Sequence, residues 1–510
     1  MKQWFTSANR VVSLPGVLGF TLLYGLLTGL QGLHPRAFDH VQNARRVGNL
    51  LTSAKPGSSW GDALESASPG LDLLGGLALA ILPGWHVRTL WGLGLLAMLV
   101  SVALLWRLMR DRAGRASAAM ACVLLVANPI TTAEAMVPSG TWPAIALFLG
   151  VWVLALEERQ TWWKAAALVV TGALWLLSWP WMLLWCALLL WNNARRRAIP
   201  ESAGNELPGM IPPSRFSPGL LLAPLLVPLL AIAIHPGFWS DPKQGLLAFG
   251  TASFLQSAGG QGLAGAFYPA GRLPLIAGAW WLFQHAHTAA LFAALVGAFR
   301  TPKIPMARES LLLLLLIPWM IPGGHIGAID STAIAMVPIS ILAAPVLVGF
   351  ARQAWEKLSQ RQAILAITAG VFAIVAPIAV SLATYFPYTG AWRGTLTDGA
   401  VAAIARGEVQ PREQLLSIGA LQTFIDAHPG CAIYAPDDSP MLEEYIRAGV
   451  IPNALTPSRA GATHILRRVP RQNSESPPAA FALDKAQEAT MFGPGDLPLF
   501  VLIANDADNN

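Results

Sequence analysis

The chain has 510 residues, of which 54% are hydrophobic and 12% are charged. This composition excludes a soluble globular protein of this length, because such proteins carry about 25% charged residues. The formal net charge of +6 comes from short basic clusters between apolar runs, as in the cytoplasmic loops of membrane proteins, so nucleic acid is not an expected partner. The three cysteines show no disulfide framework or zinc spacing. The sequence therefore predicts an integral membrane protein.

Apolar runs long enough to cross a bilayer recur along residues 1–386 and predict about eleven transmembrane helices. The runs lie near residues 11–33, 86–106, 116–136, 141–156, 164–178, 179–192, 218–234, 274–299, 309–323, 329–351 and 363–386. Basic clusters occupy alternate connections, on the side of Lys2 and Arg10, which the positive-inside rule assigns to the cytoplasm. The expected outer loops are 33–85, 133–140, 235–273 and 324–330.

The first outer loop is expected to hold two interfacial helices. The first is amphipathic, and its apolar face is expected to consist of Phe38, Val41, Ala44, Gly48 and Leu51. By the same helical spacing, Asp39, Asn43 and Arg46 lie on another face. The second is the run 71–83, which at about thirteen residues is too short to cross the membrane.

Residues 387–510 form the expected second domain, a small soluble α/β unit on the outer side, because charged residues replace the apolar runs there. Helical patterns lie near 413–428 and 440–449, and strand-like patterns at 431–435, 463–469 and 498–504. The chain is thus predicted to consist of a polytopic α-helical membrane domain, residues 1–386, and this outer domain.

Several features follow one another in a known order. Asp39-His40 opens the amphipathic helix, Ser68-Pro69-Gly70 precedes the interfacial run, and Asn128-Pro129 comes before a short second outer loop. In this order and spacing, over most of its length, the chain resembles the polyprenyl-phosphate-dependent glycosyltransferases of the type C fold. That group includes protein O-mannosyltransferases and lipid A aminoarabinose transferases. It carries an Asp-Glu pair where this chain has Asp39-His40, and an Asp in the second outer loop where the nearest carboxylate here is Glu134.

The resemblance implies that a sugar moves from a polyprenyl-phosphate donor to an acceptor on the outer face of a bacterial inner membrane. The sugar stays open, and so does the acceptor, which is a lipid, a glycan or a protein. Asp39 would be the base that takes the acceptor's proton; the alternative is that its carboxylate caps the start of the helix. His40 and Glu134 would contact the acceptor or bind a divalent metal, and the need for a metal also stays open.

The leaving group of such a reaction is a lipid phosphate, which needs cations at the outer surface of the membrane. The candidates are Arg272, Arg45, Arg46, Lys243 and Arg393. Arg272 stands out because it ends the loop 235–273 directly before a spanning run, at headgroup depth. The alternative for each cation is ordinary snorkelling to the interface.

The composition and the resemblance allow other functions. A catalytically silent relative that acts as a scaffold or assembly subunit would explain the two departures, at His40 and in the second outer loop. A transporter or flippase is disfavoured, because the sequence shows no inverted repeat and no matching pair of broken helices. The leading interpretation is the glycosyltransferase, and it depends mainly on Asp39.

Overall fold

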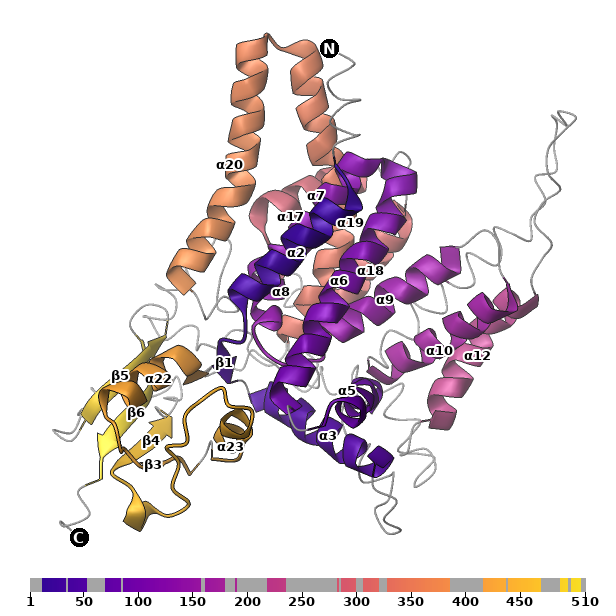
Figure 1. The fold of residues 1–510 in the computed structure, drawn as a ribbon. Coiled ribbons are helices and arrows are strands. Elements are labelled where there is room, and N and C mark those ends of the chain that lie inside the picture. Colours follow the sequence, from indigo (N-terminus) through magenta and orange to yellow (C-terminus); the bar gives the residue numbers. More distant parts are fainter. Residues whose placement is uncertain are drawn as a thin grey trace, which may run out of the picture.

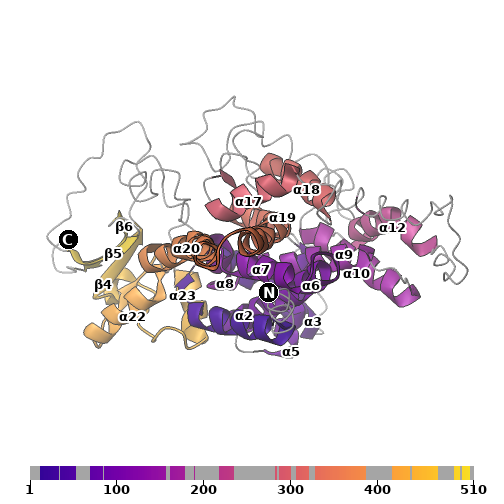
Figure 2. The same ribbon diagram turned by 90° about the horizontal axis from the view of Figure 1, so that it is seen from above.

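The computed structural model describes residues 12–33, 35–52, 69–83, 86–156, 161–178, 189, 218–234, 282–283, 286–299, 306–320, 328–385, 416–436, 439–468, 487–493 and 497–505. Apolar helices make up most of the molecule, and a small mixed α/β unit lies at one end (Figure 1). Seen from above, this unit and helix α12 lie on opposite sides of the molecule (Figure 2). The predicted helical chain with a small C-terminal α/β unit is confirmed. The boundary at residue 386 and the number of membrane spans stay predictions.

Most of the apolar runs coincide with helices. These are α2 (Leu14–Thr28), α6 (His86–Ala113), α9 (Thr141–Leu156), α10 (Trp162–Ser178), α12 (Pro218–Ile234), α17 (Thr288–Phe299), α18 (Ala307–Met320), α19 (Ala328–Lys357) and α20 (Gln360–Tyr385). The run 179–192 lies outside the described residues apart from Leu189. By length and composition, three of the described helices can cross a membrane, or four if one bent pair is counted as a span.

That bent pair corrects one prediction. The run 116–136 is not a single helix but α7 (Arg115–Val126) followed by α8 (Pro129–Ala135), with an angle of 65° between them. The break has a local cause, because Pro129 lacks the N–H that would continue the helix and restricts the preceding residue to extended conformations. Asn128 is extended, and its side chain accepts a hydrogen bond from the Ile130 amide at 3.0 Å, which starts α8.

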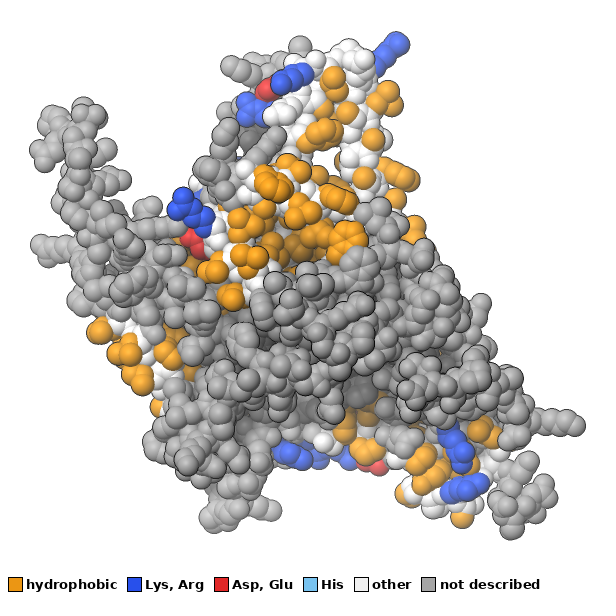
Figure 3. Space-filling view, turned by 180° about the vertical axis from the view of Figure 1, so that it is seen from behind, with side chains coloured by type: hydrophobic (Ala, Val, Ile, Leu, Met, Phe, Trp, Pro, Cys, Tyr) orange, Lys and Arg blue, Asp and Glu red, His pale blue; other side chains and the backbone are white. Residues whose placement is uncertain are grey.

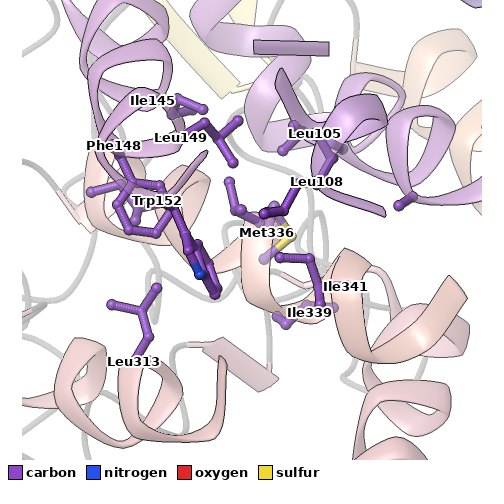
Figure 4. Close-up of a cluster of buried hydrophobic side chains, with 14 of the residues drawn as sticks. Leu105, Leu108, Ile145, Phe148, Leu149, Trp152, Leu313, Met336, Ile339 and Ile341 are labelled. Atoms are coloured by element: carbon purple, nitrogen blue, oxygen red, sulfur yellow. The ribbon is translucent and has the colours of Figure 1, made fainter. Parts of the chain in front are cut away.

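The core of the helical part lies where α6, α9, α18 and α19 meet. Figure 4 shows Leu105 and Leu108 of α6 facing Met336 of α19, with the aromatic residues of α9 beside them. The rings of Phe148 and Trp152 meet edge to face, with their centroids 5.5 Å apart. These contacts fix the relative positions of helices that come from distant parts of the chain.

Helices α19 and α20 form a hairpin that extends beyond the other helices (Figure 1). Its surface is apolar along its length, and charged side chains gather at its tip (Figure 3). Phe372 is 70% exposed and Leu365 is 68% exposed, which suits helices in contact with lipid. Arg352 and Glu356 form an ion pair of 2.8 Å near the tip, within the basic cluster that the sequence assigned to one side of the membrane.

The segment 33–85, predicted to be the first outer loop, contains the expected helix pair, α3 (Pro35–Thr52) and α5 (Pro69–Ile81). The helices run side by side in the same direction, because a Cβ atom on Gly75 would lie 2.8 Å from Ala44 and one on Gly48 would lie 3.2 Å from Leu79. The apolar face of α3 is confirmed at Val41, Ala44 and Gly48, which are buried. The prediction is wrong at Leu51, which is 40% exposed because α5 ends before it reaches this residue.

The C-terminal unit has a four-stranded sheet in the order β3-β4-β6-β5. Its elements are β2 (Leu416–Ser417), α22 (Ile418–Ala427), β3 (Ile433–Tyr434), α23 (Ser439–Arg447), β4 (His464–Arg468), β5 (Gln487–Gly493) and β6 (Leu497–Ala504). Strands β3 and β4 are parallel, and the other pairs in this sheet are antiparallel. The predicted helices and strands are present, but residues 416–417 of the predicted helical stretch 413–428 form strand β2, so α22 begins only at Ile418. Strands β2 and β5 were not predicted.

Candidate functional site

Asp39 lies within helix α3 and not at its start. The helix begins at Pro35, so Asp39 is its fifth residue and lies beyond the first turn, which contains no acidic residue. A capping carboxylate binds free amides from a position just before the helix, so the capping alternative for Asp39 is wrong. The side chain of Asp39 lies outside what the structure describes. The role of Asp39 as the base stays a prediction.

The next residue, His40, is held by the neighbouring helix. Its Nδ1 lies 2.9 Å from Oδ1 of Asp72, which is in the first turn of α5. The His40 side chain is 11% exposed and that of Asp72 is 4% exposed. A buried carboxylate is stable only with a partner, so this bond links the two helices and fixes the imidazole ring.

Glu134 lies at the end of α8, close to the same helix pair. It is buried, and Thr141 at the start of α9 donates a hydrogen bond of 2.6 Å to its Oε2. The turn between α8 and α9 packs on α5, because a Cβ atom on Gly140 would lie 2.7 Å from Leu71. The connection between α8 and α9 therefore brings a carboxylate to the end of the molecule that carries α3 and α5.

Arg45 has a protein partner in the C-terminal unit. Its guanidinium donates to Oε1 of Glu444, and Nη1 of Arg447 lies 3.2 Å from the same oxygen. Nδ1 of His86, at the start of α6, lies 3.5 Å from Oε2. The Glu444 side chain is 6% exposed, whereas that of Arg45 is 38% exposed and keeps part of its surface open. We call Glu444, Arg45, His86 and Arg447 the Glu444 cluster.

A second set of contacts holds the C-terminal unit in place. Strand β1 (Gly32–Leu33) pairs with β2, and the buried Tyr445 hydroxyl donates to the Gly32 carbonyl at 3.1 Å. Burial raises the pKa of the Tyr445 phenol above its usual range, so the group stays protonated and keeps donating. Arg88 also donates to the carbonyl of Gly449 at 2.8 Å. The C-terminal unit is therefore built onto the end of the helical part that contains α3.

Of the other predicted site residues, the structure describes only Arg46. Arg46 is exposed on α3. Arg272, Lys243 and Arg393 lie outside the described residues, so their roles stay predictions. For a divalent metal, the described part of the chain holds no group of three His, Cys, Asp or Glu side chains close enough to bind one. Among the described candidates, His40 bonds to Asp72 and Glu134 bonds to Thr141.

No family model matches the sequence, and no curated protein matches it. The structure is similar to ArnT from Cupriavidus metallidurans bound to undecaprenyl phosphate, with a TM-score of 0.45 and 14% identity over 96% of this chain and 97% of ArnT. The apo state of ArnT from the same organism has a TM-score of 0.44 and 13% identity, over 96% of this chain and 97% of ArnT. The oligosaccharyltransferase of Archaeoglobus fulgidus gives a TM-score of 0.41 and 15% identity over 72% of this chain.

Both are type C glycosyltransferases. They belong to the group that the sequence resembles. The chain spans about half the length of the archaeal oligosaccharyltransferase, covering 54% of it.

Asp72 and Glu444 are the polar residues that sequence reasoning missed. A usable signal existed for Asp72, because it is the only charged residue in the otherwise apolar stretch Pro69–Ile81. A carboxylate in such a stretch needs a partner, and α3 offers one. For Glu444 the neighbouring Glu443 gives the same local pattern, and only the fold distinguishes the buried carboxylate from the exposed one.

Glu444→Gln is expected to lower the stability of the docked C-terminal unit by about 2 kcal/mol, because two arginines lose a charged hydrogen-bond acceptor. Glu443→Gln is the matched control, since its carboxylate is 55% exposed and lies 3.7 Å from Arg447. It should change stability by less than about 1 kcal/mol. Hydrogen exchange of the α23 amides measures the change in stability in both variants. Equal protection of these amides in the two variants would contradict the prediction.

Proposed function

We propose that the chain is a membrane glycosyltransferase. It moves a sugar from a polyprenyl-phosphate donor to an acceptor in the cell envelope, on the outer face of a bacterial inner membrane. In this proposal the N-terminus is cytoplasmic, and helices α3 and α5 and the C-terminal unit lie on the outer side. The described apolar helices that suit lipid, with the polar groups of α3, α5 and α8 together at one end, support this arrangement.

The observation that carries the proposal is the position of Asp39. It lies past the first turn of α3, where a carboxylate has no capping role, and beside a histidine fixed by a buried partner. A carboxylate past the first turn of a helix, next to a histidine whose ring is held in place, suits a general base. The oxygen of the acceptor hydroxyl forms a bond to C1 of the sugar, and Asp39 takes the proton of that hydroxyl. The bond from C1 to the phosphate oxygen breaks, and its electron pair leaves with the polyprenyl phosphate.

The departing phosphate needs positive charge close to the membrane surface. Arg46 is exposed on α3, and Arg45 keeps part of its guanidinium open while it binds Glu444. In the proposal these two arginines, with Arg272, Lys243 and Arg393, supply the donor-phosphate contacts. Glu134 contributes a further polar contact to the acceptor, positioned by Thr141.

Reconstitution tests the proposal against the silent-scaffold alternative. The purified full-length chain is placed in vesicles of bacterial polar lipids with a series of undecaprenyl-phosphate hexoses. Release of undecaprenyl phosphate is followed by mass spectrometry. An enzyme is expected to release it from at least one donor, with the sugar passing to an added membrane extract or to water. If folded protein releases none from any donor while binding undecaprenyl phosphate, the scaffold replaces the enzyme as the better explanation.

A further inference from the structure

The His40–Asp72 bond is unusual for the interface that contains it. Elsewhere α3 and α5 touch through small and apolar side chains, with Ala44 against Gly75 and Val47 against Gly76. Such contacts already bring the helices together without any charged group. A buried carboxylate carries a desolvation cost that an apolar pair of similar size avoids, so packing alone does not explain Asp72.

The bond also determines which nitrogen of His40 is available. A carboxylate accepts hydrogen bonds, so the neutral imidazole beside Asp72 carries its proton on Nδ1. The other nitrogen, Nε2, is then an unprotonated acceptor on the side of the ring away from Asp72. Among the described residues, the structure gives this nitrogen no hydrogen-bond partner. A carboxylate that fixes a histidine in this way is a recurrent device for aiming the second nitrogen at a ligand.

We propose that Asp72 is a positioning residue that aims Nε2 of His40 at the acceptor, and that the acceptor is a neutral molecule with several hydroxyl groups. This inference rests on the proposed function. One hydroxyl gives its proton to Asp39, and a neighbouring hydroxyl donates a hydrogen bond to Nε2. A phosphate acceptor has no such donor when fully ionised, and it would bring negative charge against the Asp39 carboxylate and the Nε2 lone pair. Asp39 and Nε2 of His40 together therefore favour an acceptor with several hydroxyl groups, such as a glycan, over a phosphate.

Two substitutions at His40 separate the proposed role from a mere link between helices. His40→Asn keeps an N–H at the place of Nδ1, so the bond to Asp72 survives, but it removes Nε2. His40→Gln keeps a polar group at the place of Nε2 and loses the bond. Transfer to the acceptor and hydrolysis of the donor by water are measured separately. Hydrolysis needs Asp39 but no acceptor contact, so the ratio of transfer to hydrolysis reports on Nε2.

His40→Asn is expected to lower the ratio of transfer to hydrolysis at least about tenfold. Asp72→Ala is expected to lower the ratio to a similar extent. His40→Gln is expected to lower the ratio less than either. Thermal unfolding of each variant checks the fold. An equal fall of transfer and hydrolysis in His40→Asn, or no change in the ratio, overturns the inference while leaving the proposed function standing. Absence of donor cleavage by the wild type overturns the proposed function, and this inference with it.

A second measurement does not depend on turnover. Diethyl pyrocarbonate modifies unprotonated, accessible imidazole nitrogens, and peptide mass spectrometry locates the product. In the folded wild-type protein His40 is expected to react, and an added neutral glycan acceptor is expected to slow the reaction more than inorganic phosphate does. If His40 reacts only after unfolding, Nε2 is closed to ligands and the inference is wrong. Stronger protection by phosphate would equally overturn the acceptor class.

Discussion

Replacement of Asp39 by asparagine is expected to lower the rate of sugar transfer by about a hundredfold to ten-thousandfold, the usual contribution of a general base. Asparagine preserves the size and polarity of the side chain but cannot accept the proton of the acceptor. The measurement is release of undecaprenyl phosphate and labelled product by the reconstituted protein. Transfer at the wild-type rate would remove Asp39 from the reaction.

The control for this variant is Asp111→Asn. Asp111 is an exposed aspartate in the last turn of α6, paired with Arg110 at 2.6 Å. The other end of this 28-residue helix carries His86 of the Glu444 cluster, so Asp111 is about 40 Å from the proposed site. Its replacement should leave transfer unchanged. Asp39→Asn should also leave thermal unfolding unchanged, whereas loss of a helix cap would cost about 1 kcal/mol.

The parts of the fold that the sequence predicted are those with strong local patterns. Helix α5 follows from an apolar run too short to cross a membrane, and the buried face of α3 follows from helical spacing at Val41, Ala44 and Gly48. The helices and strands of the C-terminal unit follow in the same way. Strand β5 was missed because Gln487-Glu-Ala-Thr-Met-Phe-Gly493 shows little alternation of polar and apolar residues.

The parts that could not be predicted depend on pairs of residues distant in sequence. Asp72 is 32 residues from His40, and Glu444 is 399 residues from Arg45. Helical periodicity places each residue on a face of its own helix but does not say which helix lies opposite. The break at Asn128-Pro129 was visible in the sequence. The apolar run 116–136 continues past it, so hydrophobicity alone does not mark where the helix ends, whereas Asn128-Pro129 does.

The same dependence on close contacts makes α3 and α5 sensitive to one methyl group. Gly76→Ala places a Cβ atom 2.4 Å from Cγ1 and 2.6 Å from Cβ of Val47, and 3.0 Å from the backbone nitrogen of Gly48. A β-branched side chain and backbone atoms cannot rotate away, so the helices must separate. The expected loss of stability is about 1–3 kcal/mol, which outweighs the better helix propensity of alanine.

Gly92→Ala in α6 is the matched control, because a Cβ atom there meets nothing within 4 Å. It should hold or raise stability by up to about 1 kcal/mol, since alanine favours a helix. Thermal unfolding in detergent compares the two variants, and equal midpoints would show that α3 and α5 are not packed as closely as described. Any separation of the helices also lengthens the bond between His40 and Asp72. Gly76→Ala should therefore reduce the ratio of transfer to hydrolysis as Asp72→Ala does, even at temperatures where the protein stays folded.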